Sequence, residues 1–293
     1  MTIQIGVLGN ADSWYLADLA RAAEERGATI RRVDYRTLTA NVGHDARRFS
    51  AGEVDLLALD AVIVRTMPPG SLEQVVFRMD ILSRLEAEGV AIVNSPRAIE
   101  HAVDKYLATA KLASAGLPVP ETSVCESAEQ AMFELERLGG DVVVKPVFGA
   151  EGRGIVRVSD PYIGLRVFRT LERVDAVLYL QRFIDHPGYD LRVLVLDDQP
   201  LGAMRRYATN GFRTNVACQG RAVAVEPTDE EVRLAIEATR VIGARIAGID
   251  LLRDAEGRTS VIEVNGVPGW QAFQRATGID VAGRLIDRIM PKD

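Results

Sequence analysis

Residues 248–270, GIDLLRDAEGRTSVIEVNGVPGW, constrain the fold more than any other stretch of the chain. Two apolar runs flank a polar loop with Gly257 near its centre, a pattern that is typical of a β-hairpin. If the turn centres on Glu256 and Gly257, Asp250 pairs directly with Glu263 across the two strands. The sequence therefore predicts two carboxylates that face each other between apolar neighbours.

The facing carboxylates predict a metal site, because like charges directly opposite each other destabilise a sheet unless a cation lies between them. Asn265 follows Glu263 by two residues, so its side chain is expected on the same face. Oxygen ligands of this kind suit Mg²⁺ or Mn²⁺, completed by water and substrate phosphates. The alternative is that both carboxylates face solvent on an edge hairpin. The abrupt strand end at Gly266, Pro268 and Gly269 favours the metal site.

The first hundred residues alternate between strand and helix patterns. An alternating strand at residues 3–7 precedes a helix that Asp12 or Ser13 can cap, and apolar runs at 61–64 and 90–93 enclose a second helix. This β-α-β order predicts a parallel sheet with right-handed crossovers. The turn after the first strand lacks the G-x-G-x-x-G fingerprint, which gives little support to dinucleotide binding.

Two arginines, Arg65 and Arg78, follow the apolar run 61–64. Ligands of open α/β sheets bind at the carboxyl ends of the strands, so an arginine at this place can meet an anionic substrate. A salt-bridged arginine on the surface is an equally good interpretation.

The segment 142–154 places a lysine before a glycine-rich loop. Lys145 belongs to the run VVVKP, and three glycines occur in the six residues 149–154. Such a loop lets backbone N–H groups approach phosphate oxygens closely, and the lysine adds positive charge. It is not a Walker A loop, because no G-K-[ST] opens a helix. A plain structural turn is the alternative, and Lys145 favours phosphate binding.

A second group of basic residues contains Arg205, Arg206 and Arg213, with Asn215 close by in the sequence. The formal net charge of the chain is −6, so this group is more consistent with an anion site than with a solvated face. The same net charge argues against a general binder of nucleic acids or membrane surfaces.

Other classes of protein fit the composition poorly. Two cysteines among 293 residues are too few for a disulfide scaffold or a cysteine-rich metal site. The amino terminus has no features of a signal peptide, so a cytoplasmic location is expected. His44, His101 and His186 share no helical or strand spacing, so no histidine-based zinc site is expected.

Lysines, a glycine loop, oxygen ligands and arginines together fit nucleotide phosphoryl transfer, in which catalysis is mostly positioning and neutralisation of charge. Ten short motifs follow one another from Asn94 to the carboxyl terminus: N-S-P, D-K, V-V-V-K-P, G-A-E-G-R-G, Q-R-F-I, G-Y-D-L-R-V, F-R-T-N, G-I-D-L-L, E-V-N-G-V-P-G and T-G-I-D-V-A. On these motifs the chain resembles the ATP-grasp superfamily and, within it, the RimK-type carboxylate–amine ligases.

The resemblance implies an α/β fold of the ATP-grasp kind, in which two α+β subdomains enclose a nucleotide. A Rossmann-like domain with a parallel sheet would occupy residues 1–100. The central ATP-grasp subdomain would follow at 101–184, and the carboxyl-terminal subdomain with the metal site at 185–293.

The resemblance also implies the cofactors ATP and Mg²⁺ or Mn²⁺, with two ions held by Asp250, Glu263 and Asn265. The implied nucleotide contacts are Lys105 and Lys145 on the phosphates, Gly149, Glu151, Gly152 and Gly154 in a loop over them, Gln181, Arg182, Phe183 and Ile184 at a hinge facing adenine, Asp190 at the ribose, and Arg213, Thr214 and Asn215 near the γ-phosphate.

In the implied reaction, a carboxylate attacks the γ-phosphate to give an acylphosphate and ADP, and an amine then displaces phosphate to form an amide. Arg205 and Arg206 would stabilise the acylphosphate and the oxyanion. RimK-type enzymes usually supply the amine as L-glutamate, so L-glutamate and a carboxylate acceptor are the expected partners. Members of the family are often dimers or tetramers, so a homo-oligomer would be in keeping with it.

Three departures from the family pattern bear on the substrate. Arg182 stands where glutamate is frequent at the hinge, and Gln219 stands where a Gly-Gly pair is common. The stretches R-T-M-P-P-G-S-L-E-Q and V-P-G-W are similar to a RimK-like subgroup of C1-carrier biosynthesis, of the tetrahydromethanopterin or methanofuran type.

Other functions stay open at this point. The chain could add glutamate or aminoadipate to a carrier protein of lysine or arginine biosynthesis, or glutamate to a ribosomal protein. It could also be a nucleotide-binding regulator that retained the fold without turnover. The complete set of Asp250, Glu263, Asn265 and Arg205 argues against the regulator, because binding alone does not need all four.

Overall fold

A computed structural model describes residues 2–43, 48–149, 153–208 and 221–290 of the chain. The backbone forms two compact units. Unit 1 comprises Met1–Ile99, Gly243–Ala247 and Gly266–Asp293, and unit 2 comprises Glu100–Ile242 and Gly248–Asn265. The chain therefore leaves unit 1 and returns to it twice.

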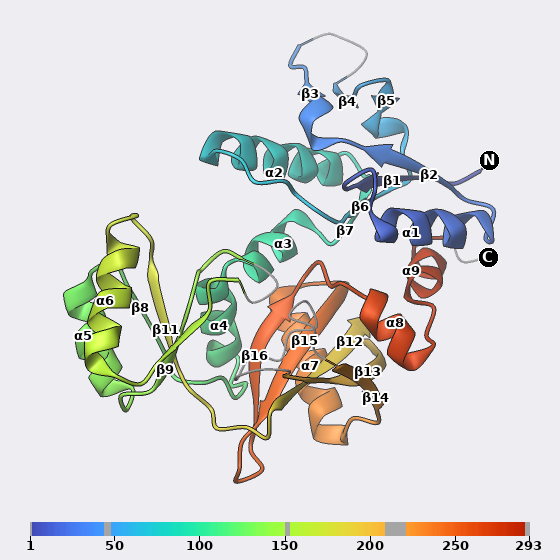
Figure 1. Cartoon of the computed structure of the whole chain (residues 1–293). Helices are drawn as coiled ribbons and strands as arrows, with labels where there is room; N and C mark the ends of the chain where they lie inside the picture. The colour runs from blue at the N-terminus through green and yellow to red at the C-terminus, as the bar shows by residue number, and fades with distance from the viewer. Residues whose placement is uncertain (1, 44–47, 150–152, 209–220, 291–293) are drawn as a thin grey trace. The chain divides into compact units, whose positions relative to one another are not determined.

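The centre of unit 1 is a four-stranded parallel sheet in the order β2-β1-β6-β7 (Figure 1). Its strands and their connecting helices are β1 (Gln4–Leu8), α1 (Trp14–Glu24), β2 (Thr29–Val33), β6 (Ala61–Val64), α2 (Leu72–Ala87) and β7 (Ala91–Val93). Ile5 and Val7 have no exposed surface, in keeping with their place in the central strand. The prediction of a parallel sheet from the β-α-β pattern is confirmed.

A small antiparallel sheet between β2 and β6 was not predicted from the sequence. Its strands are β3 (Leu38–Ala40), β4 (Phe49–Ala51) and β5 (Val54–Asp55), and two 3₁₀ turns, η1 (Tyr35–Thr37) and η2 (Leu56–Ala58), flank it. Strands of two or three residues are too short to show a recognisable alternation of apolar and polar positions.

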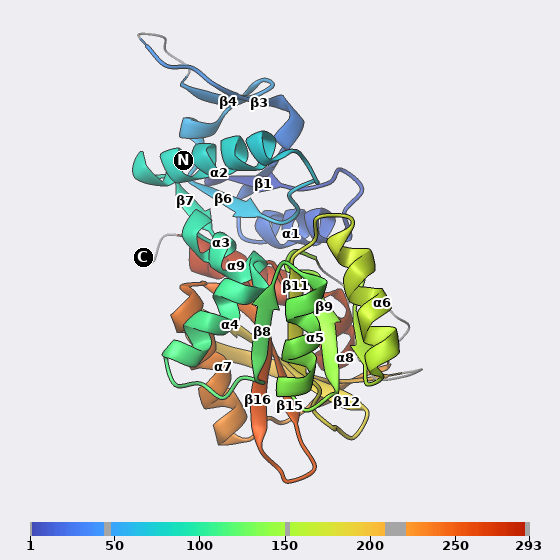
Figure 2. The same ribbon diagram turned by 90° about the vertical axis from the view of Figure 1, so that its left-hand side faces the viewer.

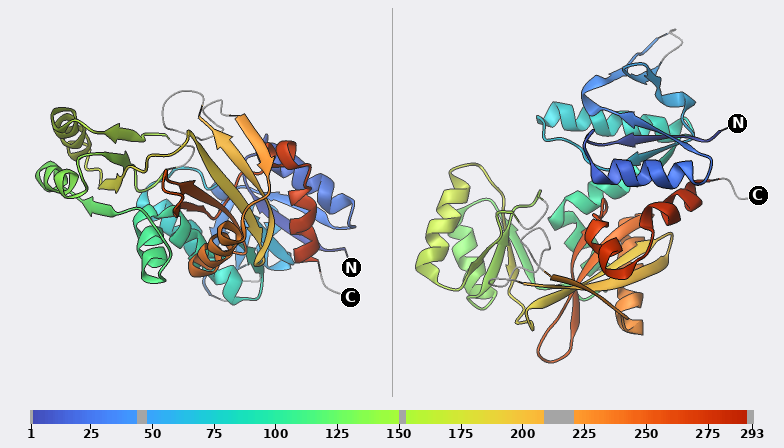
Figure 3. Two further views of the ribbon diagram at one scale, coloured as in Figure 1. Left: turned by 90° about the horizontal axis from the view of Figure 1, so that it is seen from below. Right: turned by 45° about the vertical axis from the view of Figure 1, so that its right-hand side comes forward.

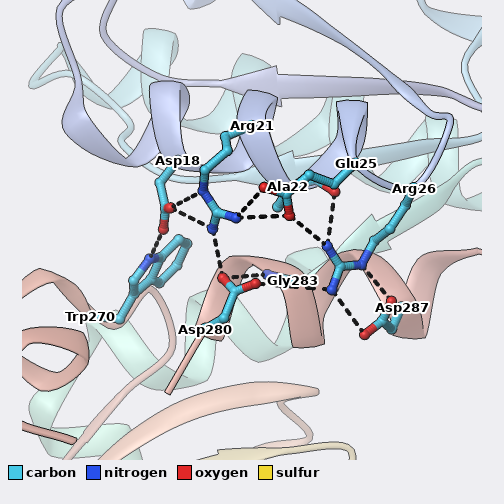
Figure 4. Close-up of polar contacts among 9 residues, drawn as sticks. All are labelled: Asp18, Arg21, Ala22, Glu25, Arg26, Trp270, Asp280, Gly283 and Asp287. Atoms are coloured by element: carbon cyan, nitrogen blue, oxygen red, sulfur yellow. Dashed lines mark hydrogen bonds and ion pairs between the residues drawn. The ribbon is translucent and has the colours of Figure 1, made fainter. Parts of the chain in front are cut away.

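The carboxyl-terminal helices α8 (Gln271–Thr277) and α9 (Val281–Ile289) belong to unit 1 rather than to the carboxyl-terminal subdomain expected at 185–293. Figure 3 shows α9 beside α1. Arg21 on α1 and Arg26, just beyond the end of this helix, pair with Asp280 and Asp287, at 2.7 Å and 2.5 Å (Figure 4). These charged pairs join the two ends of the sequence.

Trp270, directly before α8, is completely buried and belongs to the core. Its indole Nε1 donates a hydrogen bond of 2.9 Å to Asp18 on α1 (Figure 4). The segment that follows the predicted metal strand is therefore anchored in unit 1.

Unit 2 begins with the end of α3 (Pro96–Val103) and with α4 (Lys105–Ser114), and its first sheet is antiparallel in the order β10-β9-β11-β8. The strands are β8 (Thr122–Cys125), β9 (Val142–Lys145), β10 (Val156–Val158) and β11 (Leu178–Arg182). Figure 1 shows α5 (Ala128–Arg137) and α6 (Pro161–Glu172) together on one face of this sheet. Phe168 and Leu135 fill the space between the helices and the strands.

The second sheet of unit 2 has five strands in the order β14-β13-β12-β15-β16. Its elements are β12 (Tyr189–Leu196), β13 (Gln199–Tyr207), β14 (Arg221–Val225), α7 (Asp229–Ile242), β15 (Ile246–Arg253) and β16 (Thr259–Asn265). Helix α7 packs against β12 and β16. Among the described residues, no helix is both long enough and apolar enough to cross a bilayer.

Candidate active site

Strands β15 and β16 form the predicted hairpin (Figure 2). Asp250 pairs directly with Glu263 across it. Nearer the turn, Arg253 pairs with Thr259, which is one residue out of step with the first pair. An irregularity in the register between Asp250 and Leu251 absorbs the difference. The expected pairing is confirmed, but a β-bulge rather than a symmetric turn produces it.

Glu263 and Asn265 complete the oxygen-rich end of the hairpin. The carboxylate of Glu263 is half-buried and makes no hydrogen bond or salt bridge with a described residue. The side-chain nitrogen of Asn265 lies 3.5 Å from the Oδ2 atom of Asp250. The three residues expected to bind metal therefore lie together.

Asp250 is 3% exposed and is held by two arginines from neighbouring strands. Arg192 on β12 donates to both oxygens of Asp250 at 2.7 Å, and Arg206 on β13 lies 2.8 Å from Oδ2. Burial alone would raise the pKa of Asp250, but the charges of Arg192 and Arg206 outweigh it and hold the pKa below its usual value. Asp250 is therefore ionised and fixed in orientation.

Arg206 also pairs with Asp190, which is 2% exposed, through contacts of 2.7 Å and 2.5 Å. The two carboxylates raise the pKa of Arg206 above its usual value, despite an opposing effect of burial. Arg206, which is expected to stabilise the acylphosphate and the oxyanion, thus lies beside Asp250, one of the three candidate metal ligands. Asp190, which is expected at the ribose, accepts two hydrogen bonds from Arg206.

Arg205 does not join this group, contrary to the expectation that it acts with Arg206. Adjacent residues of a strand point to opposite faces of a sheet. Arg205 therefore faces away from Asp250, into a small pocket that also contains Glu226 and Arg253, and its guanidinium lies over the ring of Tyr189 at 4.8 Å.

Arg192 is the residue of the site that the sequence did not single out. It lies two positions after Asp190 in the motif G-Y-D-L-R-V, so both side chains point to the same face of β12. The spacing of two residues was the available signal. Without knowing that β12 and β15 are neighbours, nothing linked Arg192 to Asp250.

Lys145, at the end of β9, lies in the same cavity as Asp250 and Glu263. Its ammonium group donates a 2.7 Å hydrogen bond to Gln181, whose own amide donates to Thr122 and Tyr179. Burial lowers the pKa of Lys145 to about 8, an effect that the positive charge of Lys105 reinforces and that the negative charges of Glu263 and Asp250 partly oppose. An anion bound next to Lys145 would stabilise the charged form of its ammonium group.

Lys105 begins α4 and reaches the glycine loop, because its ammonium group donates to the carbonyl oxygen of Gly149 at 2.7 Å. Gly154, at the far end of the loop, has a φ of +73°, a conformation that favours glycine. The other expected nucleotide contacts, Glu151, Gly152, Arg213, Thr214 and Asn215, lie outside the described residues.

A cavity between the two sheets of unit 2 brings most of the remaining predicted residues together. Its polar end contains Lys145, Asp190, Asp250 and Glu263. The rest of its lining consists of Pro120, Val143, Ile155, Gln181, Arg182, Phe183, Ile184, His186, Leu252 and Ile262. Apolar walls with carboxylates and an ammonium group at one end suit a flat heterocycle that carries phosphates.

The hinge strand differs from the family pattern in a way that the structure explains. Arg182 pairs with Glu121 at 3.1 Å, so the charge of the substituted residue is compensated next to the cavity. The ring of Phe183 is covered by the guanidinium of Arg157 at 3.5 Å, and Arg157 is itself held by Asp141. Two of the residues expected at the hinge therefore contact charged side chains, Arg182 through an ion pair and Phe183 through a cation–π contact.

The donor set fits a hard cation. Asp250, Glu263 and Asn265 offer only oxygen ligands besides the amide nitrogen, and within the described part of the chain no side chain forms a hydrogen bond or salt bridge with the Glu263 carboxylate. Across the described ranges, no cluster of three or more histidine, cysteine, aspartate or glutamate residues could hold a metal alone. A divalent ion at this hairpin would therefore need ligands from water and a bound phosphate, as Mg²⁺ usually does.

Comparisons with known proteins agree with this geometry. Residues 102–289 match the family model described as the RimK-like ATP-grasp domain, and residues 3–99 match that of the RimK PreATP-grasp domain. The chain is 35% identical to a tetrahydromethanopterin:alpha-L-glutamate ligase of Methanosarcina acetivorans, over 97% of this chain and 98% of that protein. It is 31% identical to a probable alpha-L-glutamate ligase of Vibrio cholerae, over 98% and 95% of the two chains.

Solved structures show the same fold. The ATP-grasp ligase PsnB, complexed with a minimal precursor, superposes with a TM-score of 0.79 at 25% identity and 99% coverage of both chains. The same ligase with Mg and ADP gives a TM-score of 0.77 at 24% identity, covering 97% of this chain and 96% of that one. The D-cycloserine synthetase DcsG gives 0.74 at 19% identity, covering 98% and 100%.

Proposed function

The chain belongs to the RimK-like ATP-grasp ligases of the alpha-L-glutamate ligase family, and we propose that it joins L-glutamate to a small-molecule acceptor of the tetrahydromethanopterin type. The observation that carries the choice of acceptor is the 35% identity, over nearly the whole of both chains, to a tetrahydromethanopterin:alpha-L-glutamate ligase. The stretches R-T-M-P-P-G-S-L-E-Q and V-P-G-W support the same class of acceptor.

In this proposal ATP lies in the cavity of unit 2, with the adenine beside Phe183 and Ile184. Lys145 and Lys105 hold phosphate oxygens, and the phosphates replace Gln181 and the Gly149 carbonyl as their partners. Both lysines already point toward polar partners in this region, so little reorganisation is needed.

Asp250, Glu263 and Asn265 would hold Mg²⁺ between the protein and the phosphates. When bound, the ion neutralises charge on the phosphate oxygens during transfer. Arg192 and Arg206 keep Asp250 ionised and oriented, which supports a role for Arg206 beside the reacting groups. A carboxylate oxygen of the acceptor attacks the γ-phosphorus, and ADP leaves. The amine of L-glutamate then attacks the acylphosphate carbon, loses a proton and releases phosphate.

ADP release by the purified protein tests the proposal. The assay contains ATP, Mg²⁺ and L-glutamate with a panel of carboxylate acceptors, including a tetrahydromethanopterin-type pterin and a methanofuran-type compound, and products are analysed by mass spectrometry. We expect glutamate-dependent ADP release with the pterin and a product heavier by one glutamyl residue. Turnover only with a protein acceptor would contradict the small-molecule assignment. Tight binding of Mg·ATP without any turnover would favour a regulator.

A further inference from the structure

Arg65, directly after β6, is a buried cation in unit 1. Its side chain is 8% exposed and lies between two aromatic rings, with its guanidinium carbon 4.5 Å from the ring centre of Tyr15 and 4.1 Å from that of Trp270. Its Nη2 atom donates a 2.9 Å hydrogen bond to the carbonyl oxygen of Pro268. The surface salt bridge considered from the sequence is therefore not the role of Arg65.

The charge of Arg65 has no carboxylate partner among the described residues. The Nε atom is sealed from solvent without any hydrogen-bond partner. Burial lowers the pKa of the guanidinium to about 10, and Tyr15 opposes this effect only in part. Asp18, the nearest buried acid of α1, is already engaged by Trp270 and Arg21. A bound anion would stabilise a buried cation of this kind.

The N-terminus of α1 adjoins Arg65 and is also unsatisfied. Ser13 is the N-cap residue, but its side chain makes no capping hydrogen bond, and the backbone N–H groups of Trp14 and Tyr15 donate to no described residue. By contrast, a side chain caps each of α2, α4, α5, α6 and α9, while the short helix α8 has no side-chain cap either. Free N–H groups at a helix N-terminus attract anions.

Both features lie at the place where open α/β sheets bind ligands. The strand order β2-β1-β6-β7 reverses between β1 and β6, and ligands bind in such folds outside the carboxyl ends of the two strands at the reversal. Arg65 directly follows β6, and its N–H donates to the carbonyl oxygen of Leu8, the last residue of β1. Helix α1 begins a few residues beyond the same end of β1.

We propose that Arg65 and the N-terminus of α1 form a carboxylate-binding subsite in unit 1, which holds an anionic group of the ligase's substrate. Planar guanidinium groups and helix N–H groups both recognise carboxylates. Two stretches that mark the subgroup, R-T-M-P-P-G and V-P-G-W, meet here through Arg65, Pro268 and Trp270. The identity of the carboxylate rests on the proposed function, in which L-glutamate is a dicarboxylate, whereas the subsite itself rests on the geometry of unit 1.

Ser13→Asp tests the subsite more cleanly than a change of Arg65. Removing the guanidinium would leave a gap between two rings and could unfold unit 1. Aspartate at the N-cap satisfies the free N–H groups and supplies the negative charge that the ligand would bring, so it competes with the ligand while favouring the fold. Ser13→Asn caps the helix without a charge. Ser127→Asp is the matched control, because Ser127 is the N-cap of α5 in unit 2 and already bonds Gln130.

The full chain is titrated with L-glutamate and with glutarate, without ATP or Mg²⁺, and binding is followed by ligand-observed NMR. We expect Ser13→Asp to weaken the affinity for both probes about tenfold, and Ser13→Asn to weaken it less. The melting temperature of Ser13→Asp should stay constant or rise, a combination that mere damage to the fold would not give. Ser127→Asp should retain the affinity of the unchanged chain.

Three results would overturn the subsite: no binding of either probe to the unchanged chain, equal affinity in Ser13→Asp, or an equal loss in Ser127→Asp. The proposed function is judged apart from these results. If turnover depends on glutamate but Ser13→Asp leaves the affinity for both probes unchanged, the subsite alone is rejected. Binding of glutarate that depends on Ser13, without glutamate-dependent turnover, would support the subsite and reject only L-glutamate as its ligand.

Discussion

Two groups of arginines and aspartates with the same chemistry differ in burial. The sheet network, made of Asp190, Arg192, Arg206 and Asp250, has side chains that are 2% to 14% exposed. The helix network joins α1 to α9 through Arg21, Arg26, Asp280 and Asp287, whose side chains are 24% to 51% exposed (Figure 4). The number and length of ion pairs are similar, so the surroundings decide what each network does.

Removing one partner of a buried ion pair strongly destabilises the fold, because the remaining charge cannot turn to water. The sheet network therefore has to be nearly complete, and its geometry is set by bidentate contacts of 2.7 Å between Arg192 and Asp250. Exposed pairs lose little, since water and salt replace the missing partner. We therefore infer that the sheet network positions Asp250 at the site. The helix network instead attaches α9 to α1.

The same substitution in each network tests the comparison most strongly. Arg206→Met leaves Asp190 and Asp250 buried with fewer partners, so we expect a loss of about 3 to 5 kcal/mol in the free energy of unfolding. Arg21→Met leaves carboxylates that reach solvent or keep another donor, and we expect about 1 kcal/mol or less. Urea unfolding of both variants measures the difference. Equal losses would mean that burial does not separate the networks.

Glu263→Gln separates activity from stability at the same site. Glu263 makes no hydrogen bond or salt bridge with a described residue, so we expect its charge to serve a ligand more than the fold. We expect ADP formation to fall about a thousandfold, because the cation loses a charged ligand, while the free energy of unfolding changes by about 0.5 kcal/mol or less. Glu256→Gln, in the exposed hairpin loop, is the matched control and should retain turnover. A large loss of stability in Glu263→Gln would make the trio a structural site.

The lowered pKa of Lys145 predicts that the affinity for ATP and the stability of the fold change in opposite directions as the pH rises. Its pKa is lowered from 10.5 to about 8, so the unfolded chain binds more protons at this group between those values, and the stability of the free protein rises with pH there. The affinity for ATP without Mg²⁺ should instead fall up to tenfold per pH unit above about 8, as the ammonium group loses its proton. Lys145→Arg should flatten the binding profile, since arginine keeps its charge. An unchanged profile in that variant would remove Lys145 from phosphate binding.

Neighbouring arginines show how far the sequence could reach. Alternation along β13 requires that Arg205 and Arg206 face opposite sides, but it does not say which side carries Asp250. That follows only from the pairing of Asp190 with Arg206 in the hairpin of β12 and β13. We expect Arg205→Ala to retain ADP formation within about threefold, whereas Arg192→Ala loses most of it, because Arg192 donates to Asp250 and Arg205 faces the other side of the sheet.

The order of strands and helices and the hairpin itself could be predicted, because both are local patterns. The return of residues 266–293 to unit 1 could not, since it depends on Trp270 meeting Asp18 and on α9 meeting α1 across more than 250 positions of sequence. The bulge beside Asp250 was equally invisible, yet it puts Glu263 opposite Asp250. Local chemistry predicted Asp250, Glu263 and Asn265 as candidate metal ligands, and long-range packing decides which arginines contact Asp250.

The smallest expected effect concerns the pair of Arg26 and Asp287 in the helix network. Their side chains are 24% and 51% exposed, so the double-mutant cycle of Arg26→Ala and Asp287→Ala should give a coupling of about 0.2 to 1 kcal/mol in the free energy of unfolding. Because the pair is open to solvent, raising the salt concentration from 0.1 M to 1 M should remove most of this coupling. A coupling above about 2 kcal/mol that resists salt would show that α9 shields the pair as well as the sheet shields Asp250. In that case the exposed network would also fix the geometry of unit 1, and the two networks would differ in position rather than in kind.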